Sequence, residues 1–188
     1  MHSYSSEMVP VSFLAGSSGL WRVDRIVSVR GQSLPPATRL ERVEGRASSP
    51  GSVVSWTLRG VTSHARYVTA IEKAALEAVQ PVLGRPEATR AALIPIRKSS
   101  AWWALSQDER RAIFEEKSHH IRVGLEYIPA VARRLFHSRE LGEPFDFLTW
   151  FEFSEAQATA FETLVGRLRE TAEWRFVERE VDIRLALE

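Results

Sequence analysis

The chain has 188 residues, of which 44% are hydrophobic and 26% charged, and this composition excludes a disordered chain or a coiled coil. It is long enough for one sizeable core or for two small halves that share a sheet. Its 25 Lys and Arg nearly balance its 24 Asp and Glu, so no overall charge attracts nucleic acid or an anionic membrane, and any anion site must be local. Because Cys is absent, disulfides, thiolate zinc sites and a cysteine nucleophile are excluded.

The N-terminal residues do not resemble a secretory signal. Residues 1–6 lack a basic region, and the apolar stretch at 8–15 is short, broken by proline and without a convincing cleavage site. No run approaches the roughly 18 to 20 apolar residues of a membrane-spanning helix. We therefore expect a soluble, cytoplasmic protein that binds neither membrane nor nucleic acid.

Three predicted helices begin with a pair of residues that can cap the first turn. In each pair a Ser or Thr is followed three residues later by Glu or Gln, so that both side chains can satisfy free backbone N–H groups. The pairs are Thr69/Glu72, Ser106/Glu109 and Ser154/Gln157. The first helix is expected to end near residue 83, and the second must end before Pro129. The third has apolar residues spaced for one stripe over a sheet, namely Phe161, Leu164, Val165 and Leu168.

Extended runs rich in β-branched and aromatic residues predict strands between these helices. They cover Val9–Ala15, Trp21–Val29, Val53–Tyr67, Ala92–Arg97, Val131–Ser138, Phe145–Phe153 and Trp174–Leu185. The segment Gly31–Gly51, rich in Ser, Pro, Arg and Gly, is interpreted as a long surface connection or flexible arm. The strands and helices together indicate the α+β class.

From residue 92 onward the elements read strand, helix, strand, strand, helix, strand, which is the ferredoxin-like order. We therefore divide the chain into a C-terminal half, 92–188, and a reduced N-terminal half, 1–91, with three strands and one helix. Two such sheets could close into one barrel.

The run Phe145–Phe153 indicates what surrounds its strand. Alternation places its four phenylalanines, at 145, 147, 151 and 153, on one face and Leu148 and Trp150 on the other, so both faces need cover. Helices can cover one face. The other must meet a second sheet, another subunit or a large apolar ligand.

Few residues carry a recognisable chemical motif. The sequence contains no HExxH or GxSxG motif and neither of the glycine-rich phosphate-binding loops. The pair His119/His120 is more typical of a surface or capping position than of a metal site. A single His ligand, as a haem needs, leaves no spacing signature, so the residues alone do not choose between His119 and His120.

Two arginines lie on one predicted strand, and an aromatic pair follows another. Alternation places Arg133 and Arg134 on opposite faces, so that one of them points inward. A buried guanidinium is usually paired or holds an anion, although an arginine that reaches the barrel rim needs neither. Lys98 ends a strand, and Trp102 and Trp103, which follow it closely, are more typical of core or interface packing than of a cofactor site.

A longer pattern of residues runs through the second half of the chain. It comprises Ile96–Ser99 with Trp102 and Trp103, the capped helix Ser106–Arg111, His120 with Gly124 and Tyr127, and the runs Ala132–Phe147, Thr149–Glu152 and Glu173–Trp174. This pattern resembles the chlorite dismutase family of haem b proteins, specifically its short-chain branch. The resemblance covers the chain well from about residue 92 to the end and is thinner before it. It implies two ferredoxin-like halves in a dimeric α/β-barrel fold.

The resemblance assigns roles to individual residues. The family's haem-ligating histidine precedes the distal residue by thirteen positions, which selects His120 when Arg133 is the distal residue. The proximal Lys and Glu that hydrogen-bond this histidine correspond to Lys98 and Glu173. The distal glutamine of the short branch falls on Gln80.

The identity of the distal residue indicates the reaction. Relatives that decarboxylate coproheme have glutamine where the dismutases have arginine, so Arg133 favours chlorite chemistry. The resemblance implies one haem b per subunit and conversion of chlorite into chloride and dioxygen, through Cl–O cleavage to a ferryl haem and hypochlorite, which recombine with O–O bond formation. Arg133 suits the capture and retention of small anions, because it is a permanent cation with a fork of donors.

The resemblance also implies surroundings for this site. Trp102 and Trp103 are expected to pack near the haem edge and the subunit interface, and the short branch forms homodimers. Two alternatives stay open. One is a peroxidase-like or haem-handling enzyme related to the coproheme decarboxylases, and the other is a barrel subunit without haem that serves as an interaction module.

Overall fold

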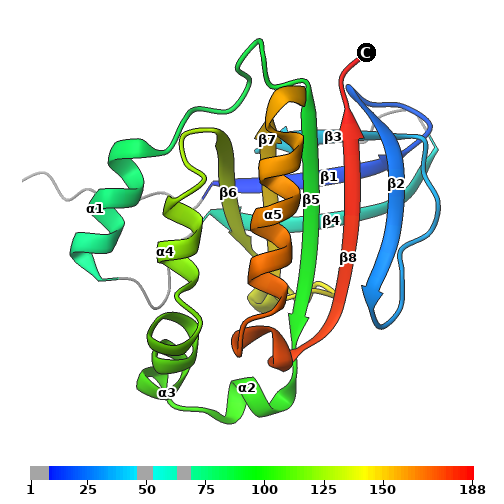
Figure 1. The fold of residues 1–188 in the computed structure, drawn as a ribbon. Helices are drawn as coiled ribbons and strands as arrows, with labels where there is room; N and C mark the ends of the chain where they lie inside the picture. The colour runs from blue at the N-terminus through cyan, green and yellow to red at the C-terminus, as the bar shows by residue number, and fades with distance from the viewer. Residues whose placement is uncertain (1–8, 46–52, 63–68) are drawn as a thin grey trace, which may run out of the picture.

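A computed structural model describes residues 9–45, 53–62 and 69–188 (Figure 1). The strands are β1 Pro10–Gly16, β2 Trp21–Arg30, β3 Arg39–Glu44, β4 Val54–Thr62, β5 Arg90–Lys98, β6 Val131–His137, β7 Phe147–Phe153 and β8 Val177–Ala186. The α-helices are α1 Ala70–Val79, α2 Ser100–Ala104, α3 Gln107–Arg111, α4 His120–Leu125 and α5 Ala158–Arg169. A π-helix covers Ala112–Lys117, and short 3₁₀ turns cover Arg139–Leu141, Glu155–Gln157 and Glu173–Phe176.

The strands close into one barrel in the order β1-β3-β2-β8-β5-β7-β6-β4. Every neighbouring pair is antiparallel. The barrel joins two sets, β4-β1-β3-β2 and β8-β5-β7-β6, which meet where β2 pairs with β8 and β4 with β6. The α+β class and the closed sheet are thereby confirmed, and the second face of β7 is covered by the rest of the barrel.

β3 corrects one prediction. It lies within Gly31–Gly51, which the sequence predicted to be a surface connection or arm, and it pairs along its whole length with β1. Charged residues dominate this strand, so its alternation is hard to recognise, and Leu40 is its one fully buried apolar side chain. The prediction failed because Leu40 is the single buried apolar residue on the inward face of β3, which is too weak a pattern to indicate a strand.

The other predicted strands are confirmed with shifted ends. Val53–Tyr67 forms β4 as far as Thr62, and its part at 63–67 lies outside the described residues. Trp174–Leu185 begins not as a strand but in the 3₁₀ turn Glu173–Phe176, so that β8 starts only at Val177.

The barrel interior is a packed apolar core. Phe13 contacts the rings of Phe136 and Trp150 at centroid distances of 5.7 Å and 5.6 Å. Leu148 and Trp150 face this interior, as alternation along β7 predicts. Phe145 faces it too, which corrects the prediction that all four phenylalanines share the other face. It precedes the first residue of β7, so the alternation of that strand does not extend to it.

A second apolar layer lies between the outside of the sheet and the helices. Figure 1 shows α4 and α5 along the face formed by β5, β6 and β7. Phe161, on α5, packs against Phe151 and Phe153 of β7 at centroid distances of 5.0 Å and 4.3 Å. The apolar stripe predicted for this helix is buried along its length. Of the described helices, none is long and apolar enough to cross a membrane.

Two of the three predicted helix caps form, and the third does not. Thr69/Glu72 and Ser106/Glu109 each form the reciprocal pair of hydrogen bonds. Ser154 makes no such side-chain bond, because a 3₁₀ turn intervenes and α5 begins only at Ala158. The second predicted helix is also not continuous, since it breaks into α3, the π-helix and α4.

Candidate active site

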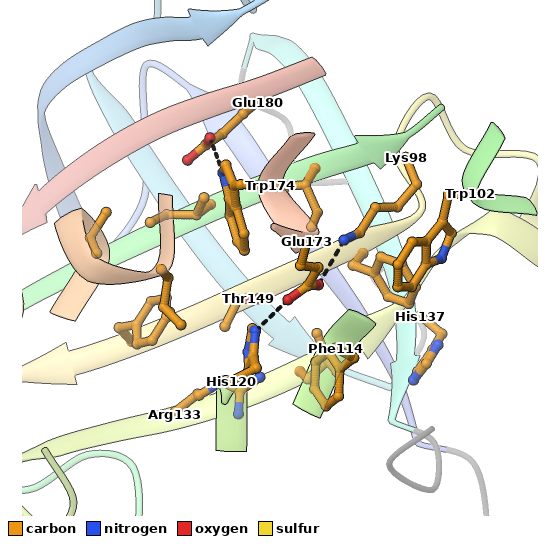
Figure 2. A pocket seen from close by; sticks show the side chains of 17 residues that line it. Lys98, Trp102, Phe114, His120, Arg133, His137, Thr149, Glu173, Trp174 and Glu180 are labelled. Carbon is orange, nitrogen blue, oxygen red and sulfur yellow. Dashed lines mark hydrogen bonds and ion pairs between the residues drawn. The ribbon is translucent and has the colours of Figure 1, made fainter. Parts of the chain in front are cut away.

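A cavity lies between the helical layer and the outer face of the sheet, and Figure 2 shows the side chains that line it. The hollow measures about 800 Å³, including its open mouth, which is within the usual range for small-molecule and cofactor sites. Most of its lining is apolar or aromatic. The exceptions are Lys98, His120, Arg133, His137, Thr149, Glu173 and Glu180.

Three of these side chains form one buried chain of hydrogen bonds. Nζ of Lys98 donates to Oε1 of Glu173 at 2.6 Å, and Oε2 of Glu173 lies 2.8 Å from Nδ1 of His120. The side chains of Lys98 and Glu173 are only 2% and 5% exposed. The structure therefore brings together Lys98, His120 and Glu173, which are far apart in the sequence (Figure 2).

The surroundings of Glu173 determine its protonation state. Burial by itself raises the pKa of Glu173, but the nearby Lys98 and His120 outweigh burial and lower this pKa to about 2. Glu173 is thus a carboxylate at neutral pH and accepts the proton that His120 carries on Nδ1. In this tautomer Nε2 holds the lone pair, so it is the ring atom available to bind a metal.

A break in the helix positions His120 as the first residue of α4. His119 before it has a left-handed backbone with φ of 51°, which is uncommon for a residue other than glycine. The hydroxyl of Ser118 accepts the backbone N–H of Glu173 at 3.0 Å. This hydrogen bond ties the end of the π-helix to the turn that carries Glu173.

Aromatic rings pack around the imidazole of His120. The ring of Phe114 stacks on it at 4.5 Å between centroids, and the ring of Trp174 lies roughly parallel to it at 6.4 Å. The ring of Trp102 lies 4.3 Å from Nζ of Lys98. These contacts restrict the rotation of the imidazole and keep water from the buried ion pair.

Arg133 lies on β6 with its side chain lining the same cavity, together with Leu135 and His137. As alternation predicted, Arg134 lies on the opposite face, where it donates to the carbonyl of Pro81. Burial lowers the pKa of Arg133, and Glu173 partly offsets this effect. Within the described residues, no hydrogen bond or ion pair involves its guanidinium group. Among these residues it is therefore an unpaired cation, and it faces a mostly apolar cavity.

Two other predicted residues, Gln80 and Trp103, are not among the residues that line the cavity. Gln80 directly follows α1, and its side-chain amide donates to the main-chain carbonyl of Arg133. Trp103 does not line the cavity but stacks on Phe147, one of the lining residues. Trp102, in contrast, lines the cavity beside Lys98.

Asp146 supports the site but was given no role from the sequence. Its Oδ2 accepts the backbone N–H of Lys98 at 2.7 Å and the indole N–H of Trp103 at 3.3 Å. Burial raises its pKa above the usual range. The position of Asp146 between Phe145 and Phe147 in the sequence could have indicated a buried carboxylate. Its partner, the backbone of Lys98 on β5, could not have been found, because it depends on the pairing of distant strands.

The fold and the site together define a class of protein: an α+β barrel in which a carboxylate-bound histidine faces the same cavity as an arginine that has no hydrogen-bond or ion-pair partner among the described residues. A sequence model described as "Chlorite dismutase" matches residues 38–187. The chain belongs to the chlorite dismutase family. The resemblance seen in the sequence is thereby confirmed.

Individual relatives agree with this result. The dimeric chlorite dismutase of Nitrobacter winogradskyi is 59% identical, with a TM-score of 0.87, over 95% of this chain and 99% of that one. A mutant chlorite dismutase from Candidatus Nitrospira defluvii is 23% identical and shares the fold, with a TM-score of 0.70 over 97% and 93% of the two chains. The chlorite dismutase of Ideonella dechloratans is 33% identical over 66 residues, which are 35% of this chain but only 22% of that protein.

Proposed function

We propose that the protein is a haem b enzyme that converts chlorite into chloride and dioxygen. The observation that carries this proposal is Arg133, whose guanidinium has no partner in the part of the chain that the structure describes and lines the same cavity as His120. An enclosed cation without a carboxylate partner is suited to a small anion, and the histidine is suited to hold iron. Membership of the chlorite dismutase family and the similarity to the Nitrobacter winogradskyi enzyme support the choice of chlorite.

The lining residues fit a haem. A porphyrin needs a large apolar cavity and one imidazole nitrogen, and the cavity offers apolar walls together with Nε2 of His120. His120 would hold the iron, Lys98 and Glu173 would hold His120, and Trp102 would pack beside the group. When bound, haem supplies iron for the breaking and making of bonds to oxygen.

The chain's own residues have separable tasks in this reaction. Glu173 keeps the proton of His120 on Nδ1, which makes the ligand more basic than a free imidazole. Arg133 binds chlorite through its forked donors and retains anionic chlorine species until dioxygen has formed. The apolar walls exclude water, which strengthens this attraction.

We propose a supporting task for Gln80. The hydrogen bond that its side-chain amide donates to the main-chain carbonyl of Arg133 holds β6 at the residue that carries the cation. In this role Gln80 orients Arg133 and contributes to catalysis through it. Trp103 would act from outside the cavity, by packing against Phe147.

The division of the chain belongs to the same proposal. We propose two ferredoxin-like halves, at 1–91 and 92–188, of which the second binds haem. The strand order supports this division, because β4-β1-β3-β2 and β8-β5-β7-β6 both read 4-1-3-2 when numbered within each set. The first set is reduced, since only four residues connect β1 and β2, too few for a helix.

A homodimer with one haem per subunit is proposed from the dimeric relative, and the cytoplasmic location stays a prediction.

The test is dioxygen release, measured on an oxygen electrode, from haem-loaded protein given chlorite. We expect rapid release by the natural sequence, loss of haem binding in His120→Ala, and slower release with faster haem bleaching in Arg133→Ala. Protein that binds haem but releases no dioxygen would overturn the proposed reaction. Good peroxidase turnover in that case would support the peroxidase-like or haem-handling alternative.

A further inference from the structure

Glu180, on β8, is a charged cavity residue that the proposed reaction does not use. It is 0% exposed, and alternation places it and Asp182 on the outer face of the strand, toward α5. Val181 and Ile183 point into the barrel. A carboxylate in such a place needs partners for both of its oxygens.

The two oxygens of Glu180 have different partners. Oε1 accepts Nε of Arg169 at 2.7 Å, and Arg169 also donates to Asp182 at 2.8 Å. Burial opposes the charge of Arg169, but its hydrogen bonds to the two carboxylates outweigh burial and raise the pKa of this arginine. Oε2 accepts the indole N–H of Trp174 at 2.7 Å. The arginine therefore balances the charge, and the second oxygen is left as a fixed acceptor for Trp174 (Figure 2).

Trp174 connects Glu180 to the histidine. It directly follows Glu173 in one short 3₁₀ turn, and its ring lies within 22° of the plane of the His120 ring. The same ring is 5.6 Å from Nζ of Lys98. The indole therefore packs against both partners of Glu173, and its orientation affects the whole hydrogen-bonded chain.

The main chain of this turn is held independently. Arg30 donates to the carbonyl of Trp174 at 2.8 Å, and Ser118 accepts the N–H of Glu173 at 3.0 Å. These bonds do not fix the side chain of Trp174. That side chain is held by the hydrogen bond that its indole N–H donates to Oε2 of Glu180. Stability alone does not require a charge here, because apolar residues of similar volume often replace buried ion pairs without loss.

We propose that Glu180, charge-balanced by Arg169, is a positioning residue that fixes Trp174 against His120 and thereby keeps Glu173 aligned with Nδ1 of His120. The inference deepens the proposed function, on which it rests for the role of His120 as the haem ligand. Glu180 touches no reacting group in this scheme and acts through Trp174.

The test compares Glu180→Gln with Glu178→Gln in the haem-loaded, reduced protein. Glu178 lies on the same strand, but it is half exposed and pairs with Arg97, so its change is a matched control. We expect Glu180→Gln to lower the iron–histidine stretching frequency in resonance Raman spectra, because a poorly aligned Glu173 makes the ligand less basic. The control should leave the frequency unchanged. An equal frequency in both variants would overturn the proposal.

A second variant and a second measurement cover the other outcomes. Trp174→Phe keeps the Glu180–Arg169 ion pair and an aromatic ring but removes the indole donor, so it should shift the frequency in the same direction even if Glu180→Gln does not fold. In haem-free protein, NMR should show the Nδ1–H of His120 exchanging about tenfold faster in either variant, as expected for a weakened hydrogen bond. Unchanged exchange would overturn the positioning role. Absence of dioxygen release by the natural sequence would overturn the proposed reaction alone.

Discussion

Replacement of Lys98 by methionine removes one member of the buried ion pair at the base of the cavity. Nζ of Lys98 lies 2.6 Å from Oε1 of Glu173, and neither side chain is more than 5% exposed. Methionine keeps much of the length and apolar volume of lysine, so packing changes little. What changes is that the carboxylate of Glu173 is left with His120 as its remaining partner in the chain of hydrogen bonds.

The size of the effect follows from the pKa of Glu173. Its ordinary value of 4.5 falls to about 2 in the folded protein, and Lys98 is the largest favourable cause. A difference of this size corresponds to about 3 kcal/mol at roughly 1.4 kcal/mol per pKa unit. Removal of one partner from a buried pair generally costs about 3–5 kcal/mol. We therefore expect Lys98→Met to lower the free energy of unfolding by about 3 kcal/mol.

Urea unfolding of haem-free protein at pH 7 measures this loss. The control is Arg97→Met, the neighbouring residue, whose ion pair with Glu178 at 2.7 Å has both side chains 45% exposed. An exposed pair contributes roughly 0–1 kcal/mol, so the control should lose little. If Lys98→Met loses no more stability than Arg97→Met, the buried pair does not stabilise the fold as argued.

The same pair predicts a dependence on pH. Because the folded-state pKa of Glu173 lies below its unfolded value, its contribution is complete above pH 4.5 and is lost as the pH falls toward 2. The free energy of unfolding should therefore decrease across this window in the natural sequence and decrease less in Lys98→Met. Urea unfolding at a series of pH values measures both slopes, and equal slopes would contradict the assignment.

Three further changes test packing and anion binding. Phe161→Ala, in the stacked layer between α5 and β7, should lower the free energy of unfolding by about 3–5 kcal/mol in urea. Gly60→Ala should lower the melting temperature, because its Cβ would lie 2.8 Å from Cβ of Phe136, whereas Gly166→Ala, which meets nothing within 4 Å on α5, should raise it. Arg133→Lys keeps the charge but loses the fork, so the KM for chlorite in oxygen-electrode assays should rise.

The sequence predicted elements whose signal is local. The stripe on α5 and the alternation of β6 each depend on neighbouring residues, and both are confirmed. Alternation placed Arg133 and Arg134 on opposite faces, and the cavity lies on the side of Arg133. β3 was missed because its inward face carries one buried leucine among charged residues. The break before α4 was missed because nothing near His119 marks a left-handed residue.

The site depends on pairings between distant parts of the chain. Lys98 meets Glu173 across 75 residues, and Asp146 meets the backbone of Lys98 across 48. Spacing in the sequence contains no information on such contacts. The choice of His120 over His119 therefore came from the family resemblance, and the structure adds the reason that Nδ1 of His120 reaches Glu173.

The charges around the cavity support the proposal that a nearly neutral protein can still attract an anion. Lys98 balances Glu173, and Arg169 from α5 balances Glu180, so each buried carboxylate of the lining has a cation beside it. Arg133 has no such partner among the described residues. The positive charge of the cavity is therefore concentrated on one side chain, inside apolar walls where water screens it little. An anion that enters the cavity would meet this charge and, among the described residues, no unbalanced carboxylate, which supports the proposed role of Arg133 as a local anion site.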